Sequence, residues 1–213
     1  MNVGGRSQYY PTPPEACGPI VDYLSVALTP GQEILDPAAG RGALPLFMRD
    51  LGARWHLIEL LDEFKPDLMR VPGAASVRIA DSLREEWPRS ACVVANPPYG
   101  RELEGFVDRI WTHARKFRVF GAVLTRITWW GEGDRGVRWR PDCLLWIRGR
   151  LSFTADGKAD SSSHCWAIWD SLPCPETRVQ WCDQSQATAR ERALQRKMLG
   201  LEGAQIGLFE APS

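Results

Sequence analysis

Apolar residues follow two alternating patterns along the chain. Short apolar runs, of the length of buried strands, are separated by segments in which apolar residues recur every three or four positions, as in helices. The pattern predicts strands at 33–35, 55–58, 77–79, 92–95, 119–124, 144–147 and 165–169, and helices at 15–28, 43–50, 103–116 and 186–199. Strands that alternate with helices indicate a mostly parallel sheet covered on both faces. We therefore expect a doubly wound α/β fold with seven strands, the last two forming an antiparallel hairpin at one edge.

The composition is that of a globular protein. The chain has 213 residues, 44% hydrophobic and 24% charged, and Lys plus Arg balance Asp plus Glu at 26 each. We expect one domain over residues 1–185, followed by a C-terminal helix and tail over 186–213. No run approaches the roughly 20 apolar residues of a membrane span. The first residues also lack the apolar core of a signal peptide, so we expect a cytoplasmic protein with no membrane partner.

The six cysteines predict reduced thiols rather than a metal centre. No two of them have Cys-x-x-Cys spacing, and Cys92 lies in an apolar run, where a thiol behaves as a small hydrophobe. His164 beside Cys165 makes a metal site the weaker alternative. We therefore expect no bound metal.

A glycine-rich loop, Asp-Pro-Ala-Ala-Gly-Arg-Gly at 36–42, follows the first predicted strand. In doubly wound sheets, ligands bind beyond the carboxyl ends of the strands. Gly40 and Gly42 permit a tight turn and let a ligand approach the backbone near Ala38. The third glycine of a dinucleotide fingerprint is absent, and Asp36 favours a cation over a pyrophosphate. The loop predicts a site for a positively charged ligand, with a plain turn as the alternative.

Acidic residues follow the next two predicted strands. Glu59 is placed to accept hydrogen bonds from the two hydroxyls of a ribose, and Asp81 from the exocyclic amine of an adenine. Each carboxylate alone is more typical of a solvated strand end. Together with the glycine loop, they describe a nucleoside that carries a positive group and no phosphate, which fits S-adenosylmethionine as the cofactor.

The fourth predicted strand is followed by Asn96, Pro97, Pro98 and Tyr99. The prolines fix the backbone and remove two amide donors, so carbonyl oxygens can point into a cleft. The Asn96 side-chain oxygen and the Pro97 carbonyl can each accept one N–H of a planar amine, which localises the nitrogen lone pair toward a methyl donor. Tyr99 offers a flat face on which the plane of the target group can stack. Positioning and oriented dipoles then carry the rate without a general base.

With these motifs, the chain resembles the class I S-adenosylmethionine-dependent amino-methyltransferases, in particular the adenine-N6 DNA methyltransferases. The N-terminal motif is residues 10–13, Tyr-Pro-Thr-Pro, the glycine loop is 36–42, and the catalytic motif is 96–99. Segments 126–130 and 148–153 are similar to segments of the small phage-type Dam methyltransferases. The resemblance implies a Rossmann-like fold, a catalytic role for residues 96–99, and a cofactor bound by the residues Tyr10, Thr12, Pro13, Asp36, Ala38, Gly40, Gly42, Glu59, Asp81 and Asn96.

A basic and aromatic segment suggests how a chain without net charge could hold duplex DNA. Residues 101–150 contain eleven Lys and Arg against six Asp and Glu. Basic residues interleaved with aromatic ones suit phosphate contact and base stacking around a flipped base. The predicted substrate-binding residues are Trp129, Trp130, Arg135, Arg138, Arg140 and Phe153. The alternative is a surface loop whose tryptophans pack on the domain.

The favoured interpretation is an adenine-N6 DNA methyltransferase, and three alternatives stay open. The same tetrapeptide would serve cytosine N4, although Asn in its first position favours adenine over cytosine. The acceptor could instead be RNA or the amide of a protein glutamine. Finally, the chain could be a catalytically silent DNA-binding module, although such a module need not keep residues 96–99. We see no segment that would form a large target-recognition domain, so we expect short or relaxed sequence specificity.

Overall fold

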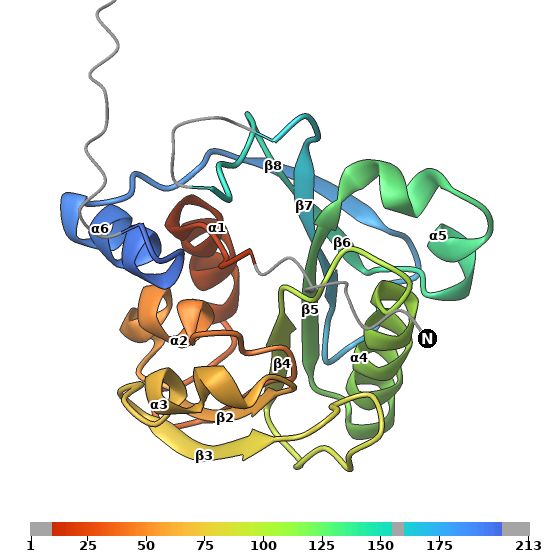
Figure 1. Cartoon of the computed structure of the whole chain (residues 1–213). Coiled ribbons are helices and arrows are strands. Elements are labelled where there is room, and N and C mark those ends of the chain that lie inside the picture. Colours follow the sequence, from red (N-terminus) through yellow and green to blue (C-terminus); the bar gives the residue numbers. More distant parts are fainter. Residues whose placement is uncertain (1–9, 155–159, 202–213) are drawn as a thin grey trace, which may run out of the picture.

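An eight-stranded mixed sheet forms the centre of the molecule (Figure 1). The computed structural model describes residues 10–154 and 160–201. The strands are β1 (Glu33–Asp36), β2 (Arg54–Glu59), β3 (Ala74–Ile79), β4 (Cys92–Ala95), β5 (Phe120–Arg126), β6 (Cys143–Ile147), β7 (His164–Trp169) and β8 (Arg178–Cys182). Their order across the sheet is β3-β2-β1-β4-β5-β7-β6-β8.

The sheet confirms the predicted mostly parallel α/β fold. Strands β1 to β5 pair in parallel with one another, and β7 runs antiparallel to both β5 and β6. Strand order reverses between β1 and β4, so the carboxyl ends of β1 and β4 lie side by side. This is the place where sheets of this type bind ligands.

The predicted count of seven strands is wrong, because β8 adds an eighth. It pairs in parallel with β6, so the β6–β7 hairpin lies one strand inside the edge. Four of the five residues of β8 are exposed, among them Val179 and Trp181. A strand held mainly by backbone hydrogen bonds carries no buried apolar run for a sequence pattern to detect.

Helices cover both faces of the sheet. They are α1 (Pro14–Ser25), α2 (Ala43–Phe47), α3 (Lys65–Leu68), α4 (Leu103–Phe117), α5 (Arg135–Arg138) and α6 (Ala189–Met198), with short 3-10 turns at Arg49–Leu51, Asp62–Phe64 and Ile127–Gly131. Helices α1, α2, α3 and α6 lie on one side in Figure 1, and α4 and α5 on the other. None of the helices in the described ranges is long and apolar enough to cross a membrane.

Two hydrophobic cores result, one on each side of the sheet. The fully buried strand β4 shows the division, because Cys92 and Val94 belong to the core beside α1 and α2, and Val93 and Ala95 to the core beside α4. Successive side chains of a strand point to opposite faces, so a strand between two helical layers must be apolar throughout. This arrangement fixes the strand ends that carry the site.

The segment that joins β8 to α6 crosses α1 closely. The Ser185 N–H donates to the Glu15 carbonyl at 3.1 Å, and the Ser185 hydroxyl donates to the Pro14 carbonyl at 3.0 Å. A Cβ on Gly18 would lie 2.4 Å from the Ser185 Cβ, so only glycine allows this approach. The first turn of α1 is thereby tied to the C-terminal part of the chain.

Helix α6 begins three residues later than the pattern predicts. Its start is a capping box, in which the Thr188 side chain and the Glu191 side chain each bond to the backbone N–H of the other residue. Gln195 donates its side-chain N–H to the Ser152 carbonyl at 3.0 Å, and Met198 is buried in the core beside α1. The division at residue 186 stays a prediction, and residues 202–213 lie outside the described part of the chain.

Candidate active site

A cavity of about 830 Å³ lies at the carboxyl ends of β1 to β4; we call it the strand-end cavity. Twelve of the predicted site residues line it: Tyr10, Thr12, Asp36, Ala38, Gly40, Glu59, Asp81, Asn96, Pro97, Pro98, Tyr99 and Phe153. Seven others do not: Pro13, Gly42, Trp129, Trp130, Arg135, Arg138 and Arg140. Residues at the ends of four adjacent strands therefore share one cavity, as parallel strands require.

Asp36 ends β1 and is the most deeply buried carboxyl group of the cavity, with 1% of its surface exposed. Burial raises its pKa to about 8, and the Glu59 carboxylate adds to the rise, although a hydrogen bond from the Ala38 N–H at 3.1 Å opposes it. A buried carboxylate is stabilised by a nearby cation. Asp36 is thus placed where a positively charged ligand group would compensate its charge.

Glu59 pins the glycine loop to the end of β2. Its Oε2 accepts the Gly40 N–H at 2.7 Å, and its Oε1 accepts the Leu61 N–H at 2.9 Å. Gly40 has a φ of 54°, in the left-handed region that favours glycine. Sequence reasoning placed Glu59 opposite ribose hydroxyls without these two partners; each carboxylate oxygen retains further acceptor capacity beside its existing bond.

Gly42 and Pro13 shape the backbone around the cavity without lining it. Gly42 has a φ of 81° and precedes α2, and a Cβ there would lie 2.6 Å from the Val71 Cγ2. Pro13 is the residue before α1, and its carbonyl accepts the Ala16 N–H at 3.0 Å. The expectation that these two residues line the cofactor site is therefore corrected: they set the turns that present Gly40 and Thr12.

Asp81 lies at the half-exposed rim of the cavity, directly after β3. Its Oδ1 accepts the Leu83 N–H at 3.0 Å, and its Oδ2 lies 3.2 Å from the Arg84 Nε, with 42% of the side chain exposed. The local turn and the neighbouring cation satisfy much of this carboxylate. A ligand amine at this rim would have to share the Asp81 carboxylate with the Leu83 N–H and the Arg84 guanidinium.

The segment 96–99 turns from the end of β4 into the cavity. The Tyr99 hydroxyl donates to the Asn96 Oδ1 at 3.0 Å, and burial raises the pKa of Tyr99, so this hydroxyl stays protonated and remains a donor. Pro97 is buried and Pro98 exposed. The Tyr99 ring meets Phe153 edge to face, with centroids 6.1 Å apart. Asn96 therefore presents an oriented side-chain oxygen with one acceptor position already used.

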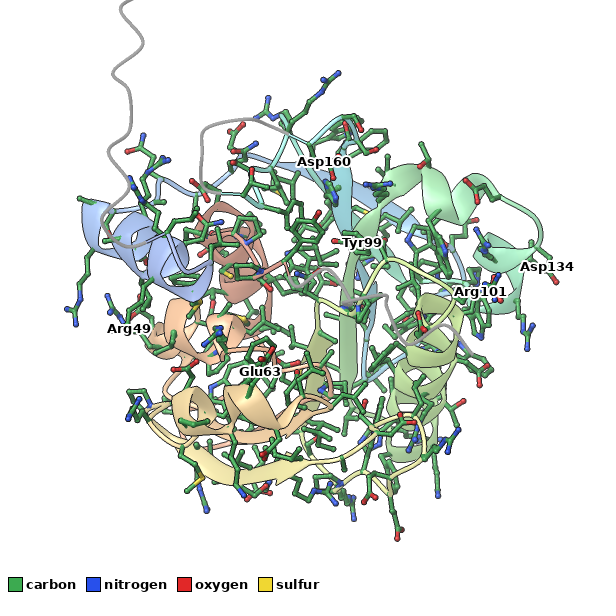
Figure 2. The ribbon with its side chains drawn as sticks, in the orientation of Figure 1. Arg49, Glu63, Tyr99, Arg101, Asp134 and Asp160 are labelled. Atoms are coloured by element: carbon green, nitrogen blue, oxygen red, sulfur yellow. The ribbon has the colours of Figure 1, made fainter. Side chains whose placement is uncertain are left out.

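Three charged residues that line the cavity were not among the predicted site residues: Glu102, Arg126 and Asp160. Arg126 ends β5, and its guanidinium lies 5.8 Å from the centre of the Tyr99 ring. Figure 2 places Asp160 above Tyr99, near the upper end of β7. The strand-end rule could have found Arg126, because the pattern ended that strand two residues early. No sequence signal marks Asp160, which a loop brings to the site.

The predicted substrate-binding residues between Trp129 and Arg140 lie outside the cavity, and their side chains have partners within the chain. Trp130 is 7% exposed and donates its indole N–H to the Thr125 hydroxyl at 2.8 Å. Arg135 pairs with Glu104 and Glu132, and its guanidinium lies 4.7 Å from the Trp129 ring centre.

The other two arginines of this segment also have intramolecular contacts. The Arg138 guanidinium lies over the Trp139 ring at 4.5 Å, and Arg140 donates to the carbonyls of Cys174 and Pro175. Trp130 is buried and packs within the domain, so the prediction that it stacks on a target base is corrected. Contact of the exposed arginines with nucleic acid stays a prediction.

Cysteine and histidine side chains form no candidate metal centre in residues 10–154 and 160–201, where no three His, Cys, Asp or Glu side chains are grouped to hold an ion. The cysteines there are free thiols, and burial raises the pKa of Cys165 to about 12. These thiols are packing groups in the structure.

Comparison with solved structures identifies the fold. A proposed RNA methyltransferase from Pyrococcus horikoshii superposes with a TM-score of 0.58 at 17% identity, covering 77% of this chain and 87% of that one. A proposed class I S-adenosylmethionine-dependent methyltransferase from Listeria monocytogenes gives 0.57 at 11% identity, covering 94% and 73%. The fold is that of the Rossmann-like methyltransferases.

A third neighbour is larger than this chain. The modification subunit of a proposed type I restriction enzyme from Vibrio vulnificus superposes with a TM-score of 0.54 at 15% identity, and the match covers 88% of this chain and 49% of that one. No family model and no curated protein sequence matches the chain. At these identities the methyltransferase fold is what the neighbours share with it.

Proposed function

We propose that the protein is an S-adenosylmethionine-dependent amino-methyltransferase that acts on the N6 amine of adenine in DNA. One observation carries the proposal: the ends of the neighbouring strands β1 and β4 place Asp36 and the segment 96–99 in the same cavity. A site for a cationic nucleoside and a site for a planar amine therefore adjoin. Methyl transfer from a sulfonium to an amine requires that adjacency.

The residues present fit the cofactor. The buried Asp36 carboxyl would hold a cationic group, the Gly40 turn leaves room at the backbone, and the Glu59 carboxylate retains capacity for ribose hydroxyls. Asp81 and Tyr10, which is 41% exposed, would close the two rims. When bound, S-adenosylmethionine would supply a methyl group on a positively charged sulfur, which would leave as a neutral thioether while the methylated nitrogen releases one proton to solvent.

The segment 96–99 would orient the amine that attacks this methyl group. Asn96 Oδ1 and the Pro97 carbonyl each accept one amine N–H, which turns the nitrogen lone pair toward the methyl group. The hydrogen bond from Tyr99 holds the Asn96 side chain in position for this contact. Phe153 and Tyr99, packed edge to face, provide the aromatic wall against which the target ring lies.

Adenine in DNA is the acceptor that the motif pattern favours. Asn at position 96 and the similarity to phage-type Dam enzymes support it. The restriction-modification neighbour is consistent with a DNA substrate, although another neighbour is described as an RNA methyltransferase. A base inside a duplex is stacked, so the target adenine would have to flip into the cavity.

A transfer assay tests the proposal. The protein is incubated with methyl-labelled S-adenosylmethionine and, in parallel, with unmethylated duplex DNA, RNA and a glutamine-containing peptide, followed by nucleoside or amino-acid analysis. We expect label in N6-methyladenine of DNA. Label in N4-methylcytosine, in RNA or in the peptide would refute the substrate assignment, and no label in any acceptor would refute the proposed activity.

A further inference from the structure

Three polar side chains beside Tyr99 take no part in the mechanism proposed above. The Asp160 Oδ2 lies 3.5 Å from the Arg126 Nη2 and 3.5 Å from the His164 Nε2. Arg126 and Asp160 both line the strand-end cavity. They come from β5 and from the segment before β7, and both strands lie on the opposite side of β4 from β1 to β3. A charged pair thus adjoins the predicted target ring.

His164 is buried next to this pair. It is 0% exposed, and its ring lies 5.0 Å from the Phe153 ring and 5.9 Å from the Tyr99 ring, between centroids. Neither ring nitrogen has a hydrogen-bond partner within the described residues. Burial lowers the pKa of His164 to about 4, so the imidazole is neutral at pH 7 and leaves Asp160 and Arg126 as the charged groups here.

Arg126 is held in place and retains free donors. Burial alone would raise the pKa of Asp160, but Arg126 and the Ser162 N–H outweigh it and keep the pKa below its usual value. The carboxylate is therefore ionised and attracts one end of the guanidinium. A guanidinium has five N–H donors and accepts no hydrogen bond, and the Arg126 side chain lines the cavity with 47% of its surface exposed, so it has donors beyond the contact with Asp160.

Asn96 and Pro97 would contact only the target amine, so another residue is needed to recognise the ring atoms beside it. In adenine two ring nitrogens with lone pairs flank the amine, N1 in the same six-membered ring and N7 in the fused five-membered ring, and either can accept a hydrogen bond from an arginine. Arg126 lies over the same Tyr99 ring whose hydroxyl holds Asn96, which puts it beside the amine site. A purine without a lone pair at the contacted nitrogen would leave the donor unpaired.

We propose that Arg126 is a specificity-determining residue that donates a hydrogen bond to a ring nitrogen that flanks the target amine, and that Asp160 is its positioning residue. The inference rests on the proposed function and deepens it, because it assigns the recognition of the base edge to a charged pair on β5 and the β7 approach. It concerns contacts that residues 96–99 do not make.

The test of this contact replaces either the ring nitrogen of the substrate or the Arg126 side chain of the protein. Arg126→Gln is compared with wild type on duplexes carrying adenine, 1-deazaadenine or 7-deazaadenine at the target position. We expect Arg126→Gln to lower kcat/KM on adenine by about 10- to 100-fold, the usual value of a charged hydrogen bond. On one of the two deaza substrates, the variant and wild type should differ by less than about 3-fold. Equal sensitivity on all three bases would overturn the inference.

Arg148→Gln is the matched control, because Arg148 pairs with Asp183 at 2.8 Å, and neither residue lines the cavity. This variant should keep wild-type kcat/KM. For the positioning role, Asp160→Asn should lower kcat/KM, and its effect should largely disappear in the Arg126→Gln background. Additive effects of the two substitutions would overturn the role of Asp160, with the melting temperatures of all variants compared as a check on folding.

Failure of the proposed function gives a different result. If wild type labels RNA or the peptide amide instead of DNA, the same comparison of Arg126→Gln with Arg148→Gln is made on that acceptor. If wild type labels no acceptor, the readout becomes equilibrium binding of the adenine and deazaadenine duplexes in the presence of S-adenosylhomocysteine. Binding by Arg126→Gln that equals binding by Arg148→Gln on every duplex would overturn the inference.

Discussion

The two halves of the sheet use charge in different ways. On the β1–β3 half, carboxylates follow the strands, and Asp36 is buried with no ion-pair partner among the described residues, with its pKa raised to about 8. On the half from β5 to β8, the buried carboxylate of Asp142 is paired with the Arg115 guanidinium at 2.9 Å. Burial disfavours the ionised form of Asp36, so this carboxyl becomes a carboxylate when a cationic ligand compensates its charge. The contrast separates the proposed cofactor side from the target side.

The largest effect should come from the seam between the halves, at Asn96. Asn96→Ala removes the side-chain oxygen that orients the amine, so we expect kcat to fall by about 100- to 1000-fold, as for loss of a key oriented dipole. Cofactor affinity, measured by calorimetry, should stay within about 3-fold, because Asp36 and Glu59 are untouched. A parallel collapse in cofactor affinity would show that the two halves are not separable.

Tyr99→Phe should lower kcat less than Asn96→Ala does. It removes the hydroxyl that donates to Asn96 at 3.0 Å but keeps the ring packed against Phe153. We expect a loss in kcat of about 10-fold, the scale of one hydrogen bond. A loss as large as that of Asn96→Ala would assign the hydroxyl a more direct role.

On the cofactor half, binding should depend on pH through Asp36. With a pKa of about 8, the free protein holds a proton on this carboxyl below pH 8, whereas a bound cation favours the carboxylate. The dissociation constant for S-adenosylmethionine should therefore rise by up to about 10-fold for each pH unit below 8. Asp36→Asn is the control, because this variant keeps the pH dependence that comes from titration of the ligand but loses the pH dependence that comes from Asp36. Identical pH profiles would contradict the assignment.

The smallest effect should come from the target half. Arg138 is exposed and pairs with no carboxylate in the described residues, whereas Arg135 pairs with Glu104 and Glu132. Arg138→Gln should weaken DNA binding about 2- to 3-fold and reduce the salt slope by about one, as for loss of one phosphate contact. Arg135→Gln should leave the salt slope unchanged. The reverse pattern would show that intramolecular pairing does not decide which arginines meet DNA.

The fold and the cavity-lining residues at the ends of β1, β2 and β4 could be predicted from the sequence because both follow local rules. An apolar run marks each buried strand, and the residue that ends the run lies at the ligand-binding edge, which located Asp36, Glu59 and Asn96. Strand β8 escaped because its residues are exposed and its place depends on backbone pairing with β6. No periodicity records that pairing.

The target side was harder to read because its contacts join residues far apart in the chain. Asp160 reaches Arg126 across 34 positions, and sequence spacing says nothing of this. Tryptophans interleaved with arginines are typical of nucleic-acid surfaces, yet here Trp130 is buried and Arg135 stacks on Trp129. Composition alone does not separate a structural cation–π pair from a binding surface.

The crossing of Ser185 over Gly18 has a consequence for how this protein is cut or fused. The contact holds the start of α1 against Ser185, which lies 167 positions after Gly18. It thereby also holds Tyr10 and Thr12, which precede α1 and line the cavity. A shortened version ending before that serine would keep every strand of the sheet while releasing one wall of the pocket. Deletions meant to trim a dispensable tail should therefore start beyond α6.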